Sequence, residues 1–98
     1  MDTVNKLYKK ITKNNDKVII FGLSYCGYSQ SAIKYLNNKN IPFKFYSIDK
    51  YYDIFFKILN KLIEIHPEIA FDTNHKTYPV IFINNRFIGG FSDLIKNI

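Results

Sequence analysis

The chain has 98 residues, of which 47% are hydrophobic and 17% aromatic, and a formal net charge of +6. These values predict one packed domain over 1–98 and exclude a disordered chain. A single cysteine excludes an internal disulfide framework, and no long apolar run is present, so we expect a cytoplasmic protein without a membrane partner. The basic residues are scattered rather than clustered, which argues against a nucleic-acid partner.

The first half of the chain alternates helical and strand patterns. Apolar residues at helical spacing predict a helix over 3–13, closed by a turn at 14–16. The β-branched and aromatic run 17–21 predicts a central strand that is covered on both faces. A helical stripe over 27–38 and an alternating segment over 43–47 complete a strand–helix–strand unit, whose two strands should be parallel.

The second half of the chain predicts a helix followed by a hairpin and a short terminal helix. Residues 51–64 repeat at helical spacing. Strands over 79–83 and 86–88 flank Asn84-Asn85, a hairpin signal because Asn tolerates positive φ. A last helix is expected over 91–97. The order of elements predicts an α/β fold in which a four-stranded mixed sheet carries helices on both faces, preceded by an N-terminal helix.

The only cysteine lies where the first strand passes into the following helix, within Ser24-Tyr25-Cys26-Gly27-Tyr28-Ser29. Unpaired N–H groups at a helix N-terminus stabilise a thiolate, so the pKa of Cys26 should fall and the thiol should become a nucleophile. Ser29 lies one helical turn later, where its hydroxyl can donate a hydrogen bond to that thiolate. The alternatives are a buried, inert cysteine and an ordinary first-turn serine.

Three motifs in this order resemble those of glutaredoxins, and the resemblance covers about 17–97. They are the Cys-x-x-Ser corner at Cys26, Thr77-Tyr78-Pro79 before the third strand, and Gly89-Gly90-Phe91-Ser92-Asp93 after the fourth. The resemblance implies a thioredoxin-like three-layer α/β/α fold and a glutathione-dependent thiol–disulfide oxidoreductase. Gly27 and Ser29 match the monothiol pattern Cys-Gly-Phe-Ser, whereas the short spacing from Phe21 to Cys26 is that of dithiol members. Leu23 stands where many members have lysine.

The resemblance also implies roles for individual residues. Cys26 would attack the glutathione sulfur of a mixed disulfide, a monothiol mechanism that needs no second cysteine. The backbone of Tyr78, fixed by a cis Pro79, would pair with the cysteinyl unit of glutathione, and Asp93 would hold the γ-glutamyl ammonium. Read without the resemblance, Ser92 and Asp93 are a helix N-cap pair. The implied glutathione-binding residues are Tyr28, Thr77, Tyr78, Pro79, Gly90, Ser92 and Asp93, with Lys76 as a further candidate for the glycyl carboxylate.

Two other functions stay open from the sequence. In the first, two protomers each supply Cys26 and two glutathiones supply the remaining sulfurs of a [2Fe-2S] cluster; otherwise we expect a monomer. In the second, the chain is a non-enzymatic thioredoxin-fold module that binds a protein partner. The expected partners of the oxidoreductase are glutathione and glutathionylated or disulfide-containing proteins. His66 and His75 should be surface residues, because no metal-ligand spacing surrounds either.

Overall fold

The computed structural model describes residues 2–13 and 17–98, so the turn predicted at 14–16 lies outside the described residues. A four-stranded sheet has the order β2-β1-β3-β4. Strand β1 pairs parallel with β2 and antiparallel with β3, and β3 pairs antiparallel with β4, which confirms the predicted mixed sheet. The strands are β1 (Val18–Gly22), β2 (Phe43–Ser47), β3 (Val80–Ile83) and β4 (Arg86–Gly89).

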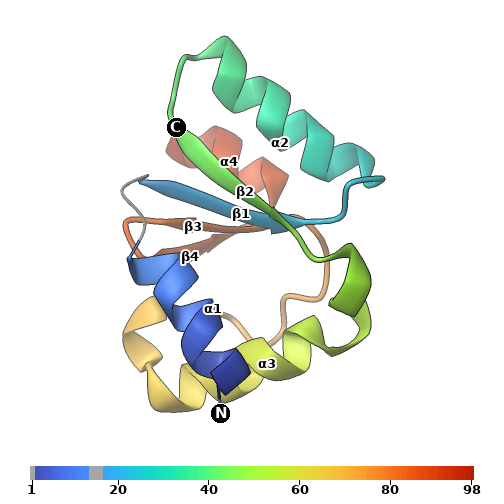
Figure 1. Ribbon diagram of the computed structural model, residues 1–98. Helices are drawn as coiled ribbons and strands as arrows, with labels where there is room; N and C mark the ends of the chain where they lie inside the picture. Colours follow the sequence, from blue (N-terminus) through green and yellow to red (C-terminus); the bar gives the residue numbers. More distant parts are fainter. Residues whose placement is uncertain (1, 14–16) are drawn as a thin grey trace.

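Helices cover both faces of this sheet, as the order of elements predicts (Figure 1). Helices α1 (Asp2–Thr12) and α3 (Tyr52–Ile65) lie on one face, and α2 (Gly27–Asn38) and α4 (Phe91–Asn97) lie on the other. Helix α3 begins one residue later than predicted, because a 3-10 turn over Asp49–Tyr51 precedes it. None of the helices in residues 2–13 and 17–98 is both long and apolar enough to cross a membrane.

Strand β1 divides the hydrophobic core in two, because successive side chains of a strand point to opposite faces. Ile19 and Phe21 pack toward α1 and α3, whereas Val18 and Ile20 pack toward α2 and α4. All five residues of β1 are buried, which confirms the central strand. The strand is shifted by one residue relative to the prediction: it begins at Val18 and extends to Gly22.

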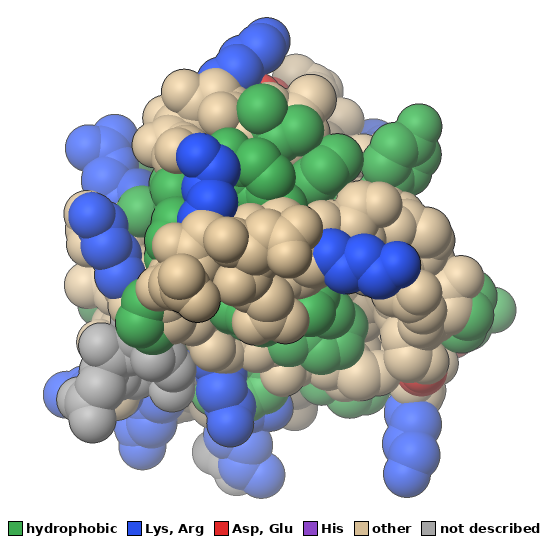
Figure 2. All heavy atoms as spheres, turned by 90° about the horizontal axis from the view of Figure 1, so that it is seen from above, with side chains coloured by type: hydrophobic (Ala, Val, Ile, Leu, Met, Phe, Trp, Pro, Cys, Tyr) green, Lys and Arg blue, Asp and Glu red, His purple; other side chains and the backbone are tan. Residues whose placement is uncertain are grey.

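The hairpin predicted between β3 and β4 is present. Asn84 and Asn85 have φ values of 52° and 70°, the left-handed conformation that a two-residue hairpin requires. Figure 2, which looks down on the side of the molecule that carries α2, shows lysine and arginine side chains dispersed around this face rather than gathered into one patch.

The end of β1 lies against the first turn of α2 so closely that only glycine fits. A Cβ atom at Gly22 would lie 2.5 Å from the Ser29 hydroxyl oxygen and 3.2 Å from the ring of Phe45. The hydroxyl belongs to a fully buried residue and cannot move into solvent. Gly22 therefore sets how closely α2 approaches the sheet.

We expect Gly22→Ala to lower the free energy of unfolding by about 1–3 kcal/mol, because overpacking forces Ser29 or Phe45 to shift. Gly27→Ala is the matched control, since nothing lies within 4 Å of a Cβ there, and it should change stability by less than about 0.5 kcal/mol. Urea denaturation of both variants measures the difference. Equal stability of the two would contradict the close packing of α2 on β1.

Candidate active site

Cys26 is the N-cap residue of α2 and follows the short turn after the end of β1. Its backbone is extended, with φ −86° and ψ 125°. Its carbonyl accepts the first helical hydrogen bond, from the Gln30 N–H at 3.1 Å, and its own N–H donates to the Leu23 carbonyl at 3.1 Å. The side chain is only partly buried. The thiol is thus fixed at the helix N-terminus and still accessible, as the sequence predicts.

The turn before Cys26 is held by two residues that the sequence analysis missed. Asp49 accepts hydrogen bonds from both the hydroxyl and the backbone N–H of Ser24, the latter at 2.9 Å. The hydrogen bond from the Ser24 hydroxyl has the larger effect on the pKa of Asp49. Together with the bond from the Ser24 N–H, it holds that pKa below its usual value. The Gln30 side-chain amide donates to the Ser24 carbonyl at 2.6 Å. The turn is therefore tied both to the 3-10 turn after β2 and to α2.

The surroundings of Cys26 favour its thiolate form. Burial opposes ionisation, but the Ser29 N–H, the Ser29 hydroxyl and the Tyr28 N–H together outweigh burial, so the pKa of Cys26 is lowered. The Ser29 hydroxyl is completely buried and makes no hydrogen bond of regular geometry with the described residues. The contribution of this hydroxyl that the structure supports is the lowering of the pKa of Cys26.

Tyr78 and Pro79 lie beside the thiol and are joined by the expected cis peptide bond. The Cys26 sulfur is 4.0 Å from the Tyr78 carbonyl oxygen, the outer limit of a sulfur hydrogen bond. Burial, with smaller effects of Tyr25 and Asp53, raises the pKa of Tyr78 to about 12. The phenol therefore stays protonated and donates to the Tyr52 carbonyl at 3.1 Å.

The residues next to Tyr78 in the chain differ in burial. Pro79 is buried, whereas the side chains of Thr77 and Lys76 are exposed. Gly90 lies next to Pro79: a Cβ on Gly90 would lie 3.5 Å from the Pro79 carbonyl oxygen. The second and third sequence motifs therefore meet in space.

Gly90 is the N-cap residue of α4, and this corrects the expected N-cap pair of Ser92 and Asp93. The Asp93 carboxylate reaches back to accept a hydrogen bond from the Gly90 N–H at 3.0 Å, so Asp93 caps from the third position. Gly89 has a φ of 126°, and a Cβ there would overlap the Asp93 carboxylate. Ser92 is exposed and does not cap.

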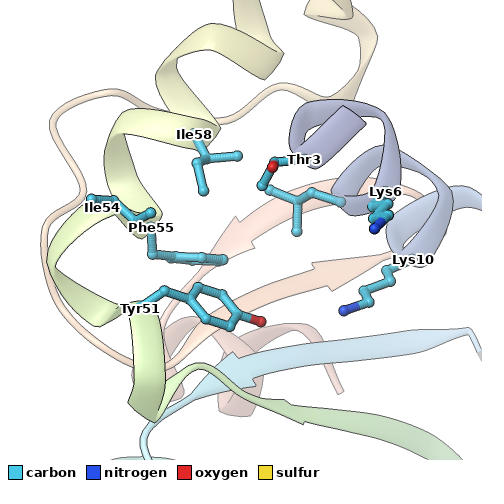
Figure 3. Close-up of a pocket in the computed structure, with 8 residues that line it drawn as sticks. Thr3, Lys6, Lys10, Tyr51, Ile54, Phe55 and Ile58 are labelled. Carbon is cyan, nitrogen blue, oxygen red and sulfur yellow. The ribbon is translucent and has the colours of Figure 1, made fainter. Parts of the chain in front are cut away.

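A cavity of about 250 Å³ lies between the first turns of α2 and α4, lined by Tyr28, Phe91 and Ser92. Tyr28 is 68% exposed, and its ring centroid is 6.5 Å from that of Phe91. A second cavity, of about 360 Å³, lies between α1 and α3 (Figure 3) and contains none of the predicted site residues. The smaller cavity is the one lined by predicted site residues: Tyr28 from the Cys26 motif and Ser92 from the motif at the start of α4.

The expectation of surface roles for both histidines is wrong for His75. Its ring centroid is 5.0 Å from that of Phe87 and 6.5 Å from that of Phe56, and its Nε2 atom is buried without a hydrogen-bond partner in the described part of the chain. His66 stacks on Tyr8 at 3.6 Å and pairs with Glu68 at 3.2 Å. Among the described residues, no group of three or more His, Cys, Asp or Glu side chains is placed to hold a metal ion.

Comparison with known proteins finds relatives that are similar over most of the chain. The glutaredoxin family model matches residues 18–88. A probable glutaredoxin of Acanthamoeba polyphaga mimivirus is 37% identical over 78 residues, which are 80% of this chain and 74% of that protein. Glutaredoxin-2 of Schizosaccharomyces pombe is 30% identical over 96 residues, which are 98% of this chain and 80% of that protein.

Solved structures show the same fold. The crystal structure of a buckwheat glutaredoxin–glutathione complex matches with a TM-score of 0.71 and covers 98% of this chain and 78% of that chain. Its sequence identity is 18%, so this likeness speaks for the fold alone. It agrees with the three-layer α/β/α arrangement described above.

We expect Ser29→Ala to raise the pKa of Cys26, because the variant removes a hydroxyl that favours the thiolate. The rate of Cys26 alkylation, measured as a function of pH, should then rise at higher pH than in the parent chain. Ser31→Ala, in the same helix but without a hydrogen bond to the thiol, is the control and should leave the profile in place. Identical profiles for Ser29→Ala and the parent chain would remove Ser29 from thiol activation.

Proposed function

The chain belongs to the glutaredoxin family of thiol–disulfide oxidoreductases, and we propose that it reduces glutathione mixed disulfides through Cys26 by a monothiol mechanism. The observation that carries this proposal is the chemistry of the thiol. Cys26 is the only cysteine, it is accessible at a helix N-terminus, and its pKa is lowered. A thiolate is the species that attacks disulfides.

The proposed reaction has two exchange steps. In the first, the Cys26 thiolate attacks the glutathione sulfur of a protein–glutathione disulfide; a Cys26–glutathione disulfide forms, and the protein thiolate leaves and takes a proton from water. In the second, the thiolate of free glutathione attacks the glutathionyl sulfur on Cys26. Oxidised glutathione leaves, and the Cys26 thiolate is regenerated. Each cycle consumes one free glutathione thiol, because the other half of the oxidised glutathione comes from the mixed disulfide, so no resolving cysteine is required at Ser29.

Glutathione would lie between the Cys26 thiol and the cavity lined by Tyr28, Phe91 and Ser92. The Tyr78 backbone, 4.0 Å from the sulfur, is in reach of a peptide bonded to Cys26. Tyr28 would cover the ligand with its exposed ring. The buckwheat protein was solved with glutathione, which makes the same ligand the first candidate here. Thr77 and Pro79, on either side of Tyr78 in the chain, would hold its backbone in position.

Asp93 would serve both α4 and the ligand. One carboxylate oxygen accepts the Gly90 N–H. An ionised carboxylate has about four lone-pair sites, so the same side chain can also accept a hydrogen bond from the γ-glutamyl ammonium. The Gly90 and Ser92 backbones at the start of α4 would face the γ-glutamyl carboxylate.

The two alternative functions, an iron–sulfur cluster carrier and a protein-binding module, predict different measurable properties. A cluster ligated by Cys26 from two protomers and two glutathiones would give a coloured dimer with a visible absorption band. A binding module would show no turnover with glutathione. The reductase should be colourless when isolated and active as a monomer.

We expect the chain to turn over a small glutathione mixed disulfide in an assay coupled to glutathione reductase, and Cys26→Ser to abolish that turnover. Ser29→Cys should not be needed for activity, because each proposed step uses one protein thiol. Residual activity in Cys26→Ser would overturn the assignment of the nucleophile. Activity that appears only in Ser29→Cys would overturn the monothiol route.

We expect Asp93→Asn to raise the KM for the glutathione mixed disulfide about tenfold with little change in kcat. The variant loses one charge-assisted hydrogen bond, which contributes roughly 1.5–3 kcal/mol, and we take the low end because the side chain is only half-buried. Loss of the cap should cost about 1 kcal/mol of stability.

Asp72→Asn is the matched control for Asp93→Asn. The Asp72 side chain also accepts a backbone N–H, that of Asn74 at 2.9 Å, but lies outside the proposed glutathione site. Stability should therefore fall in both variants, and the KM for the mixed disulfide should change only in Asp93→Asn. A lowered melting temperature with an unchanged KM would limit Asp93 to its capping role.

A further inference from the structure

Tyr78 connects the turn before β3 to helix α3 through its side chain. Its ring centroid lies 5.1 Å from that of Phe56 and 6.1 Å from that of Phe55, distances at which aromatic rings attract each other. Its hydroxyl donates to the backbone carbonyl of Tyr52, the first residue of α3, at 3.1 Å. The side chain therefore holds the turn before β3 against the first two turns of α3.

The start of α3 is itself fixed relative to Cys26. Helix α3 follows directly on a 3-10 turn whose first residue is Asp49. The Asp49 carboxylate accepts two hydrogen bonds from Ser24, which lies two residues before Cys26 in the chain. The turn that carries Cys26 and the turn that carries Tyr78 are therefore bonded to the same short segment, residues 49–52.

This segment sets the distance between the thiol and the Tyr78 backbone. The Cys26 sulfur lies 4.0 Å from the Tyr78 carbonyl oxygen. In the proposed reaction, a glutathionyl group bonded to Cys26 also pairs with this backbone, so the peptide must meet both groups at once. Hydrogen bonds weaken steeply away from their preferred geometry, so a displaced Tyr78 backbone would bind the peptide less well.

We propose that the Tyr78 side chain is a positioning residue for glutathione, because its hydrogen bond to the Tyr52 carbonyl holds the Tyr78 backbone where a glutathionyl group on Cys26 pairs with it. This inference rests on the proposed function and adds a role for the side chain to that of the backbone. Burial raises the pKa of the phenol to about 12, so the hydroxyl keeps its proton throughout the pH range in which a thiol ionises. The alternative is that the hydrogen bond stabilises the fold alone.

The test compares the reaction of the reduced chain with two disulfides that share one leaving group. The first is the mixed disulfide of glutathione and mercaptoethanol, which offers a peptide backbone to Tyr78. The second is hydroxyethyl disulfide, which offers none. In both reactions the Cys26 thiolate attacks one sulfur, a mixed disulfide forms on Cys26, and mercaptoethanol leaves as its thiolate. Mass spectrometry of acid-quenched samples gives the two rate constants.

We expect Tyr78→Phe, which keeps the ring and loses the hydroxyl, to lower the rate constant with the glutathione mixed disulfide about two- to tenfold, the range that corresponds to one neutral hydrogen bond. The rate constant with hydroxyethyl disulfide should stay that of the parent chain. The reason is that the hydrogen bonds that outweigh burial and lower the pKa of Cys26 come from the first turn of α2.

Tyr8→Phe is the matched control. The Tyr8 ring is also packed, on His66, and its hydroxyl also makes one hydrogen bond, to Glu68 at 3.1 Å. This variant should leave both rate constants unchanged. Thermal denaturation of the two variants measures the loss of stability that a purely structural hydroxyl would cause.

Three results would overturn this inference. A preference for the glutathione disulfide that is as large in Tyr78→Phe as in the parent chain, with both rate constants unchanged, would overturn this inference alone. An equal loss with both disulfides would show that the hydroxyl acts on the fold or on the thiol rather than on glutathione. A parent chain that reacts no faster with the glutathione disulfide than with hydroxyethyl disulfide would contradict the proposed function, and this inference with it.

Discussion

The close contact between the end of β1 and the first turn of α2 is the constraint on which the site depends. Gly22 has no side chain, so the buried Ser29 can lie against the strand backbone. This contact holds the start of α2 against the C-terminal end of β1, and Cys26 lies there at the helix N-terminus. The same serine supplies, through its N–H and its hydroxyl, the groups that favour the thiolate. One packing contact therefore determines both the position and the ionisation of the nucleophile.

A second glycine plays the corresponding role at the start of α4. Gly89 has a positive φ and leaves room for the Asp93 carboxylate, which caps the helix through the Gly90 N–H. The cap places Gly90 beside Pro79, so the starts of α2 and α4 and the turn before β3 converge on one region. The carboxylate that stabilises α4 is also the proposed acceptor for the γ-glutamyl ammonium, so in this proposal folding and ligand binding share a single side chain.

The sequence predicts the elements well where hydrophobic spacing is regular. The buried run of β1, the helix over 27–38 and the Asn84-Asn85 hairpin all agree with the structure, because each is determined by neighbouring residues. The three motifs were also sufficient to indicate the family, and the structure brings them together.

Contacts between residues distant in the chain could not be predicted in this way. The hydrogen bonds from Ser24 to Asp49 join residues 25 positions apart, and nothing in the spacing of either marks the pair. The ring of His75, in the loop before β3, packs against Phe87 of β4, which is 12 positions away in the chain. The sequence pattern suggests Ser92 and Asp93 as the N-cap pair of α4, whereas the N-cap residue is Gly90. Asp93 lies at the third position of the helix, and its carboxylate accepts the Gly90 N–H.

Mass spectrometry of the intermediate tests the monothiol account most directly. The chain is mixed with a glutathione mixed disulfide in the absence of free glutathione and then quenched with acid. The account predicts a gain of one glutathionyl group, located on Cys26 and removed by adding glutathione. A chain that stays unmodified, or that instead carries the protein half of the disulfide, would contradict attack of the Cys26 thiolate on the glutathione sulfur.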